Sequence, residues 1–292
     1  MPEESFYAED ETLLHTGKTR MSYETLIHKK SRDGVIVTFN RRRQRNSINT
    51  VFLEELREIL GKAEKNPDCR YIVFKGRDGY FCSGMDFSEI GRVPVYDKEK
   101  TSAETNALYM ETVSQLTLTS KIIISIVEGN AMGGGMGFIA ASDIVFATPN
   151  ARFSLPEALW GLLPSMVVPY LIRRIGWQNA YRLSLTTMPV SAAKALEMNL
   201  ADEITKDPER SIRNLWQRMG CIQESTIINI KQYFRKMWII TEKTEQAAVQ
   251  ETSRLMSNQL VRANIYNYLN FKMYPWEKAV SDKVSESESL LM

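Results

Sequence analysis

Two short stretches near the N-terminus alternate hydrophobic and polar positions, which is the pattern of half-buried β-strands. They span residues 23–28 and 35–39, and a turn signal at residues 32–34 (Arg-Asp-Gly) lies between them. We therefore expect a β-hairpin. Residues 49–64 follow with apolar side chains at helical spacing, and residues 66–67 (Asn-Pro) predict where that helix ends.

Short apolar runs in the middle of the chain indicate buried strands, and segments with helical spacing separate them. The strands are expected over residues 71–76, 121–127 and 143–147, the helices over residues 104–118 and 133–141, and a loop over residues 79–83. Strands that alternate with helices predict an α/β architecture.

The second half of the chain, beyond about residue 170, is mainly helical in its pattern, and no internal repeat is visible. Helices are expected over residues 170–175, 180–187, 191–197, 208–220, 224–233 and 243–270. We therefore expect four parts, which are a disordered extension at residues 1–20, an α/β core at 21–205, a helical region at 206–280 and a flexible tail at 281–292.

Composition and charge argue against several classes of protein. Hydrophobic residues make up 43% and charged residues 25% of the 292 residues, the balance of a soluble globular protein. The net charge of +2 gives no reason to expect nucleic-acid binding. The longest apolar runs, such as residues 122–127, are too short to span a membrane, and the polar start of the chain lacks the apolar region of a signal peptide. We expect a cytoplasmic protein.

Cysteine and histidine are scarce, which narrows the chemistry. Cys69, Cys82 and Cys221 are scattered and make neither a disulfide framework nor a metal-ligand cluster, so no metal or redox cofactor is expected. Both histidines, His15 and His28, lie near the N-terminus. The body of the chain therefore has no histidine to serve as a general base, a triad member or a metal ligand.

A glycine-rich segment at residues 129–137 (GNAMGGGMG) lies between an expected buried strand and an expected helix. Glycines allow a ligand to approach the backbone, and the helix N-terminus favours an anionic oxygen. Two other interpretations stay open from this segment alone. Residues 135–140 also match the dinucleotide pattern G-x-G-x-x-A, and the glycines could serve only tight packing between helix and strand.

A second loop, which follows another expected strand, adds the motifs that carry a family resemblance. Residues 81–86 (FCSGMD) closely resemble the first oxyanion-hole motif of the crotonase, or enoyl-CoA hydratase/isomerase, superfamily, and residues 133–135 (GGG) resemble the second. Residues 153–157 (FSLPE) and 161–164 (GLLP) also fit in order and spacing. The resemblance extends over about residues 23–278 and implies an α/β fold, the ClpP/crotonase-like ββα spiral, with a C-terminal α-helical region.

The resemblance implies specific roles for three residues. The backbone N–H groups of Met85 and Gly134 would bind the oxygen of a thioester and stabilise its enolate, each by up to about 3–4 kcal/mol. Glu157 would be the catalytic carboxylate. Without the motif, a glutamate would be interpreted as an exposed surface acid, because most glutamates are. Further residues implied to contact the substrate are Gly84, Asp86, Gly133, Gly135 and Gly137. Asp86 also suits a second role, as an acceptor that fixes its own loop.

One departure from the hydratases narrows the reaction. Gly137 occupies the position of their first catalytic carboxylate, which leaves Glu157 as the single carboxylate. Dehydratases of polyketide β-branching cassettes also have glycine there, and they resemble this chain at residues 151–157, 173–176 and 274–277. The reaction implied is dehydration of 3-hydroxy-3-methylglutaryl-ACP to 3-methylglutaconyl-ACP. Glu157 would act as both base and acid, and a tyrosine or a bound water is an alternative second proton donor.

Three alternatives compete with this reaction. The decarboxylase that accompanies such dehydratases uses a histidine from its C-terminal half, and this chain has none there. Enoyl-CoA isomerases also use a single glutamate at the position of Glu157, so an isomerase or a hydratase of another acyl thioester stays open. A catalytically inactive crotonase that binds an acyl carrier protein is the non-enzymatic alternative.

The basic stretch at residues 41–45 (RRRQR) indicates where a carrier could bind. In the family this region lies near the nucleotide end of CoA, so Arg42 and Arg45 are implied to meet the phosphate of CoA or of phosphopantetheine, or an acidic acyl carrier protein. A solvated basic turn is the alternative. Basic residues within 231–236 could extend the patch. The resemblance also implies a homotrimer or a hexamer, in which residues 206–280 form subunit contacts.

Overall fold

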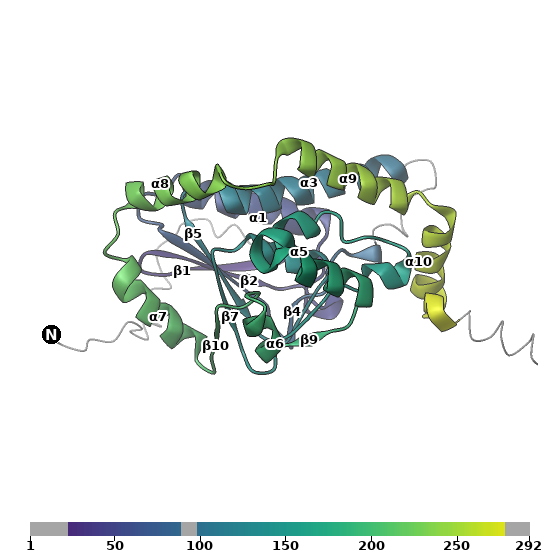
Figure 1. The fold of residues 1–292 in the computed structure, drawn as a ribbon, viewed down its shortest axis with the longest axis horizontal. Helices are drawn as coiled ribbons and strands as arrows, with labels where there is room; N and C mark the ends of the chain where they lie inside the picture. The colour runs from purple at the N-terminus through teal and green to yellow at the C-terminus, as the bar shows by residue number, and fades with distance from the viewer. Residues whose placement is uncertain (1–22, 89–97, 278–292) are drawn as a thin grey trace, which may run out of the picture.

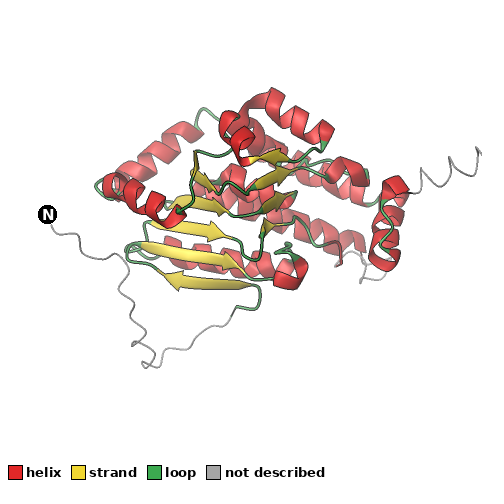
Figure 2. Ribbon diagram, turned by 90° about the horizontal axis from the view of Figure 1, so that it is seen from below, coloured by secondary structure: helices red, strands yellow, loops and turns green. Residues whose placement is uncertain are grey.

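The computed structural model describes residues 23–88 and 98–277 (Figure 1). The predicted disordered extension, residues 1–20, and the predicted flexible tail, residues 281–292, lie outside the described residues. Strands occupy the centre of the molecule and helices pack around them (Figure 2). This mixed arrangement confirms the predicted α/β class.

The larger of two sheets has six strands. In spatial order they are β1 (Leu26–Lys30), β2 (Gly34–Phe39), β3 (Tyr71–Lys75), β5 (Ile122–Val127), β7 (Ile144–Ala147) and β10 (Glu203–Ile204). β1 and β2 form the predicted antiparallel hairpin, in which Leu26 pairs with Phe39. The other neighbouring strands of this sheet run parallel to each other.

The second sheet has four short strands. In spatial order they are β4 (Tyr80–Cys82), β6 (Asn130–Met132), β8 (Arg152–Ser154) and β9 (Val190–Ser191). Along the chain, a strand of the large sheet is followed by a strand of the small sheet and then by a helix. β3 and β4 precede α3 (Lys98–Leu118), β5 and β6 precede α4 (Gly134–Ala141), and β7 and β8 precede α5 (Val168–Thr186). These repeated units form the predicted ββα spiral.

The C-terminal part of the described chain is helical, as predicted. Its helices are α6 (Ala192–Glu197), α7 (Pro208–Met219), α8 (Glu224–Arg235), α9 (Glu242–Met256) and α10 (Gln259–Phe271). Earlier in the chain lie α1 (Thr50–Glu64) and two short 3₁₀ helices, η1 (Arg42–Gln44) and η2 (Glu157–Trp160). α9 packs along α3, and α10 contacts η2 at one end of the molecule (Figure 1).

The large sheet has an apolar cluster on each face, which explains why its central strands are nearly continuous apolar runs. Successive residues of β3 point to opposite faces. Ile72 and Phe74 join the main core with α1, α3 and α4. Tyr71 and Val73 join a smaller cluster, where Trp216 of α7 packs edge-on against Tyr71 at 4.6 Å between ring centroids.

Two helix boundaries follow from local chemistry. The side chain of Asn49 accepts a hydrogen bond from Phe52 N–H at 3.0 Å and so begins α1 close to the predicted start. The helices predicted at residues 170–175 and 180–187 are confirmed as two arms of α5. They are separated by Gly176, whose φ of +76° breaks the helical backbone.

The short strands β6, β8, β9 and β10 were not predicted, and three further elements differ from their predicted form. The helix expected over residues 243–270 is two helices, because the side chain of Asn258 caps the start of α10. The loop expected at residues 79–83 contains β4, which is too short to show a strand pattern. The first strand runs over Leu26–Lys30 instead of residues 23–28, and four of its five residues are exposed because it lies at the sheet edge.

Residues 23–88 and 98–277 contain neither a membrane-spanning helix nor a cluster of metal-binding side chains. In this part of the chain, no helix is long and apolar enough to cross a membrane. The same part contains no group of three or more His, Cys, Asp or Glu side chains that could hold a metal ion. Cys69, Cys82 and Cys221 are free thiols, and only Cys221 is exposed.

Candidate active site

The two glycine loops leave neighbouring strands of the small sheet. β4 leads into Gly84, β6 leads into Gly133 and Gly134, and Cys82 pairs with Ala131 in parallel. Because parallel neighbours end at the same edge of a sheet, the loops meet there. A Cβ added to Gly84 would lie 3.3 Å from the Gly134 nitrogen and 3.5 Å from the Gly133 Cα. Its φ of +89° favours glycine as well.

The backbone N–H of Met85 points away from the chain segment beside it. Ile48 N–H donates to the Gly84 carbonyl at 2.8 Å, and Asp86 N–H donates to the Ile48 carbonyl at 2.8 Å. This isolated parallel bridge uses the peptide groups on either side of Met85, so the N–H of Met85 itself faces the opposite direction. Among the described residues, none accepts a hydrogen bond from it.

Asp86 anchors this loop to the basic segment before α1. Its Oδ2 accepts a hydrogen bond from Arg41 Nη2 at 2.7 Å, and its Oδ1 accepts one from Ser88 N–H at 2.9 Å. Burial acts to raise the pKa of Asp86, but the hydrogen bonds from Ser88 and Arg41 outweigh it, so the pKa is lowered. Asp86 is therefore an ionised loop anchor, and its contact with substrate stays a prediction.

Gly134 is the first residue of α4, so its N–H has no partner within the helix. The Gly134 N–H and the Gly133 carbonyl belong to the same peptide group. This carbonyl accepts a hydrogen bond from Met136 N–H at 2.9 Å. Gly133 N–H in turn donates to Ser154 O of β8 at 3.1 Å. Because N–H and C=O of a trans peptide point in opposite directions, the Gly134 N–H is directed out of the helix. No residue of the described ranges accepts it.

Glu157 reaches the second glycine loop from η2, which follows β8. A Cβ added to Gly133 would lie 3.2 Å from Glu157 Oε1. The residue is half-buried overall, but Oε2 is enclosed and has no hydrogen-bond partner among the residues described. Burial raises the pKa of Glu157 to about 7, against a smaller opposing effect of a hydrogen bond from its own backbone N–H. This carboxyl group can therefore take up or release a proton near neutral pH.

Gly135 and Gly137 face the interior instead. A Cβ on Gly135 would lie 2.7 Å from the Cβ of Cys82, and a Cβ on Gly137 would lie only 2.0 Å from the hydroxyl oxygen of Tyr109. The Tyr109 side chain is fully buried, and its hydroxyl donates to the Gly134 carbonyl at 2.6 Å. Close packing therefore explains why both positions are glycine. Contact of either residue with substrate stays a prediction.

An aromatic cluster that the sequence pattern does not reveal surrounds Trp160, at the end of the short helix that Glu157 begins. The surrounding rings, with centroid distances to Trp160, are Phe87 at 5.2 Å, Tyr268 at 5.1 Å, Tyr274 at 6.2 Å and Trp276 at 6.3 Å. They come from the segment just after the first glycine loop, from α10 and from the segment after α10. The cluster therefore ties the C-terminal region to both sides of the candidate site.

The two arginines predicted to meet a phosphate lie on the surface. Arg42 forms an ion pair of 2.9 Å with Asp78, and the guanidinium of Arg45 lies 5.4 Å from the ring centroid of Tyr80. Both side chains remain accessible to a partner, and their role stays a prediction. The extension of this patch by basic residues within 231–236 stays a prediction; among them, Lys231 is half-buried and pairs with Asp143 at 2.7 Å.

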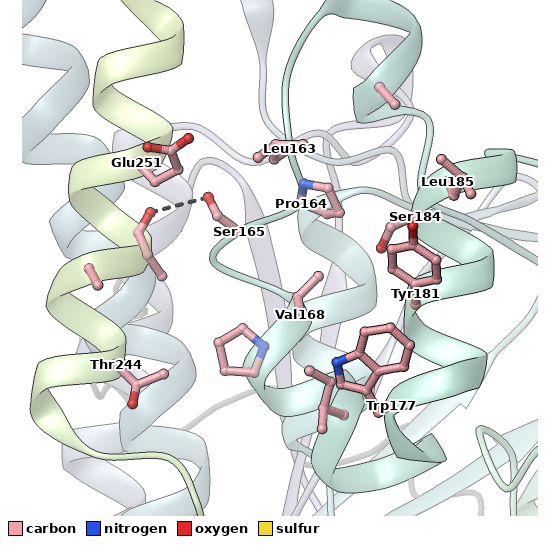
Figure 3. Close-up of a pocket in the computed structure, with 15 residues that line it drawn as sticks. Leu163, Pro164, Ser165, Val168, Trp177, Tyr181, Ser184, Leu185, Thr244 and Glu251 are labelled. Atoms are coloured by element: carbon pink, nitrogen blue, oxygen red, sulfur yellow. Dashed lines mark hydrogen bonds between the residues drawn. The ribbon is translucent and has the colours of Figure 1, made fainter.

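An apolar groove of about 510 Å³ lies between α5 and α9, apart from the glycine loops (Figure 3). Trp177 and Tyr181 stack on its wall at 4.7 Å between ring centroids, with 58% and 49% of their surfaces exposed. Ala158 is among the residues that line the groove, whereas Glu157 is not. The groove adds exposed apolar surface rather than acid–base chemistry.

Two outward-directed N–H groups beside one enclosed carboxyl group are the arrangement of enzymes that polarise an acyl carbonyl and move a proton next to it. Comparison with known proteins identifies the family. Residues 30–278 match the family described as enoyl-CoA hydratase/isomerase, and the chain belongs to this family.

Several relatives are similar over much of this chain. Bacillaene synthase dehydratase PksH of Bacillus subtilis is 30% identical over 257 residues, which cover 88% of this chain and 98% of that protein. Enoyl-CoA hydratase EchA19 of Mycobacterium tuberculosis is 32% identical over 174 residues, which cover 59% of this chain and 65% of that protein. The crystal structure of a polyketide biosynthesis enoyl-CoA hydratase (pksH) from Bacillus subtilis matches with a TM-score of 0.79 at 29% identity, over 87% of this chain and 100% of that chain.

These similarities bear on three predictions. They confirm the crotonase fold and the resemblance to polyketide dehydratases. They also confirm the predicted enzyme class, a hydratase- or dehydratase-type hydro-lyase.

Proposed function

We propose that this protein dehydrates 3-hydroxy-3-methylglutaryl-ACP to 3-methylglutaconyl-ACP in polyketide β-branching. The observation that carries the proposal is the enclosed carboxyl group of Glu157, which faces the second glycine loop while Gly137 supplies no second carboxylate. The similarity to a dehydratase of bacillaene synthase supports both the type of reaction and the polyketide context.

The proposed elimination uses Glu157 twice. The ionised carboxylate removes a proton from the carbon α to the thioester, and the N–H groups of Met85 and Gly134 bind the enolate oxygen that forms. The enolate then re-forms the carbonyl, the α,β double bond forms and the bond to the β-hydroxyl breaks. The departing oxygen takes the proton back from Glu157 and leaves as water, which makes the elimination syn and regenerates the carboxylate.

The pKa of Glu157 suits both halves of this cycle. With a pKa of about 7, a substantial fraction of the enzyme carries the ionised base at neutral pH. After proton uptake the same group is an acid near neutrality, so it can return the proton to the leaving hydroxyl without a large uphill step. Each oxyanion donor would contribute up to about 3–4 kcal/mol to the stability of the enolate.

The acyl group would arrive on the phosphopantetheine of an acyl carrier protein, with CoA as the alternative carrier. Arg42 and Arg45 would meet the phosphate or an acidic surface of the carrier, because both side chains are exposed and lie on the segment that Arg41 ties to Asp86. No metal ion or redox cofactor has a role in this proposal.

One enzymatic alternative shares the observed geometry. A single carboxylate beside two oxyanion donors can also move a proton between the α and γ carbons of an enoyl thioester, which is isomerisation. A purely carrier-binding role is less favoured by the structure, because an enclosed carboxylate without a hydrogen-bond partner destabilises the fold and serves no binding purpose.

We further propose that the protein assembles as a homotrimer or a hexamer. The exposed apolar surface around the groove supports this, since Trp177, Tyr181 and Leu185 present large hydrophobic side chains to solvent in a single chain. Light scattering coupled to size-exclusion chromatography gives the assembly state directly, and a monomer would contradict it.

Intact-protein mass spectrometry of loaded acyl carrier protein tests the proposed reaction. Wild-type enzyme is expected to remove one water from the 3-hydroxy-3-methylglutaryl form, and Glu157→Gln is not. Glu197→Gln, at an exposed glutamate that pairs with Lys194, is the matched control and is expected to retain activity. Absence of water loss with wild-type enzyme would overturn the substrate assignment and favour isomerisation.

A further inference from the structure

Tyr109 of α3 is the side chain that contacts the second glycine loop from behind. Its ring and hydroxyl are completely buried, and the hydroxyl donates to the Gly134 carbonyl at 2.6 Å. The ring also lies against Gly134, since a Cβ there would come within 3.4 Å of Tyr109 Cε2. The ring of Phe138 also packs against Tyr109, at 5.7 Å between ring centroids.

The loop needs such a contact because its own sequence does little to fix it. Gly133, Gly134 and Gly135 follow one another, and consecutive glycines have more backbone freedom than any other residues. The N-terminus of α4 has no side-chain cap. Met136 N–H fixes the carbonyl of Gly133, and Tyr109 fixes the carbonyl of Gly134. Together the two bonds restrain both peptides that adjoin the Gly134 Cα.

We propose that Tyr109 is the positioning residue of the second oxyanion donor: its hydroxyl holds the Gly134 carbonyl and so restrains the Gly134 Cα, while Met136 holds the peptide that carries the Gly134 N–H, and this N–H then points at the thioester oxygen. The inference rests on the proposed enolate chemistry and names one further residue on which that chemistry depends. The same hydroxyl occupies the space that the Cβ of any side chain at position 137 would need. Tyr109 therefore excludes a second carboxylate at that position.

The geometry assigns Tyr109 a positioning role and no part in proton transfer. The hydroxyl has no exposed surface, and its proton is directed at the Gly134 carbonyl. Burial raises the pKa of Tyr109 well above its ordinary value, with smaller contributions from Cys82 and Glu157, so the hydroxyl stays a donor throughout the pH range of the enzyme. The second proton donor, if one exists, is then a water or a different side chain.

Tyr109→Phe tests the proposal, with Tyr170→Phe as the matched control. Tyr170 is another fully buried tyrosine, and its hydroxyl donates to Glu245 of α9 instead of to a glycine-loop carbonyl. For dehydration of the loaded carrier protein, Tyr109→Phe is expected to lower kcat by about 3- to 10-fold with KM within about 2-fold, because the lost bond acts mainly in the transition state. Tyr170→Phe is expected to leave kcat within about 2-fold while lowering the melting temperature.

A spectroscopic readout separates this inference from the proposed function. A 2,4-hexadienoyl-CoA thioester absorbs at longer wavelength when donors polarise its carbonyl, so the difference spectrum of the bound probe reports the oxyanion site. Wild type and Tyr170→Phe are expected to show the full red shift, and Tyr109→Phe a reduced one. A full shift together with unchanged kcat in Tyr109→Phe would overturn the role of Tyr109. No shift in any protein would instead count against the oxyanion site, and with it the proposed function.

Discussion

The hydroxyl oxygen of Tyr109 lies 2.0 Å from the point that a Cβ of residue 137 would occupy, so Tyr109 and a side chain at position 137 exclude each other. Real Cβ atoms do not approach other atoms so closely, and the buried ring has no space to retreat. Tyrosine at position 109 therefore requires glycine at position 137.

A double-mutant cycle tests this dependence. Gly137→Ala alone is expected to destabilise the protein by about 1–3 kcal/mol, because the methyl group overlaps the Tyr109 hydroxyl. In the Tyr109→Phe background the nearest atom becomes the ring carbon at 3.2 Å, so the same change should cost less than half as much. Urea unfolding gives the free energy of unfolding of wild type, of both single variants and of the double variant. Gly61→Ala is the control, since its Cβ would meet nothing within 4 Å, and it is expected to be neutral or stabilising. If the changes in unfolding free energy caused by the two substitutions simply add, the proposed clash between residues 109 and 137 is contradicted.

Gly133→Ala should impair activity far more than stability. Its φ of +52° with a ψ of −125° is a conformation that L side chains rarely adopt, at a cost of about 1–3 kcal/mol, and its Cβ would lie 3.2 Å from Glu157 Oε1 and displace the carboxylate. Small displacements of a reacting group can lower kcat by about 100-fold. Gly79→Ala is the matched control, because Gly79 also has a positive φ, of +79°, but an open site for the Cβ. Similar unfolding midpoints with activity lost only in Gly133→Ala are expected, and equal activity would contradict the placement of Glu157.

The raised pKa of Glu157 predicts a specific dependence of stability on pH. The ordinary pKa is 4.5 and the folded-state pKa is about 7. As pH rises between these values the unfolded chain releases its proton before the folded chain does, so stability falls, and above about pH 7 the full penalty remains. A shift of this size corresponds to roughly 3 kcal/mol. Glu157→Gln should therefore exceed wild type in stability at pH 8, by up to that amount, and match it near pH 4.5. A difference that does not change with pH would show that burial does not raise this pKa.

Charge reversal at the basic segment tests the carrier contact. Arg42→Glu together with Arg45→Glu is expected to raise KM for the loaded carrier protein by about 10-fold at low salt, with kcat nearly unchanged and the effect reduced at high salt. Lys29→Glu, on the exposed edge strand β1, is the control. If the double variant and the control behave alike, the basic segment is a solvated turn.

The sequence predicted the elements whose signals are local. The strand β5, the start of α1 and the two arms of α5 depend on neighbours in the chain, and each lies close to its predicted range. The strands of the small sheet escaped prediction because two or three residues cannot display alternation. Their register comes from pairing with one another, as in Cys82 with Ala131.

In the candidate site, too, some features could be predicted from the sequence and others could not. Its glycine loops and Glu157 were predictable because they lie in motifs that resemble those of a known family. The contact of Glu157 with Gly133 and the contact of Tyr109 with Gly134 join residues 24 and 25 positions apart in the chain, and no periodicity marks them. Trp160 likewise gathers rings from three distant segments, which only the folded chain brings together.

The most direct test of the account is α-proton exchange, because it isolates the step assigned to Glu157. An acyl carrier protein loaded with a saturated acyl group that lacks a β-hydroxyl is incubated in D₂O with wild type, Glu157→Gln or Glu197→Gln, and deuterium in the acyl group is followed by mass spectrometry. The account predicts exchange with wild type and Glu197→Gln and none above background with Glu157→Gln. Equal exchange with all three enzymes would contradict the claim that Glu157 removes the α-proton.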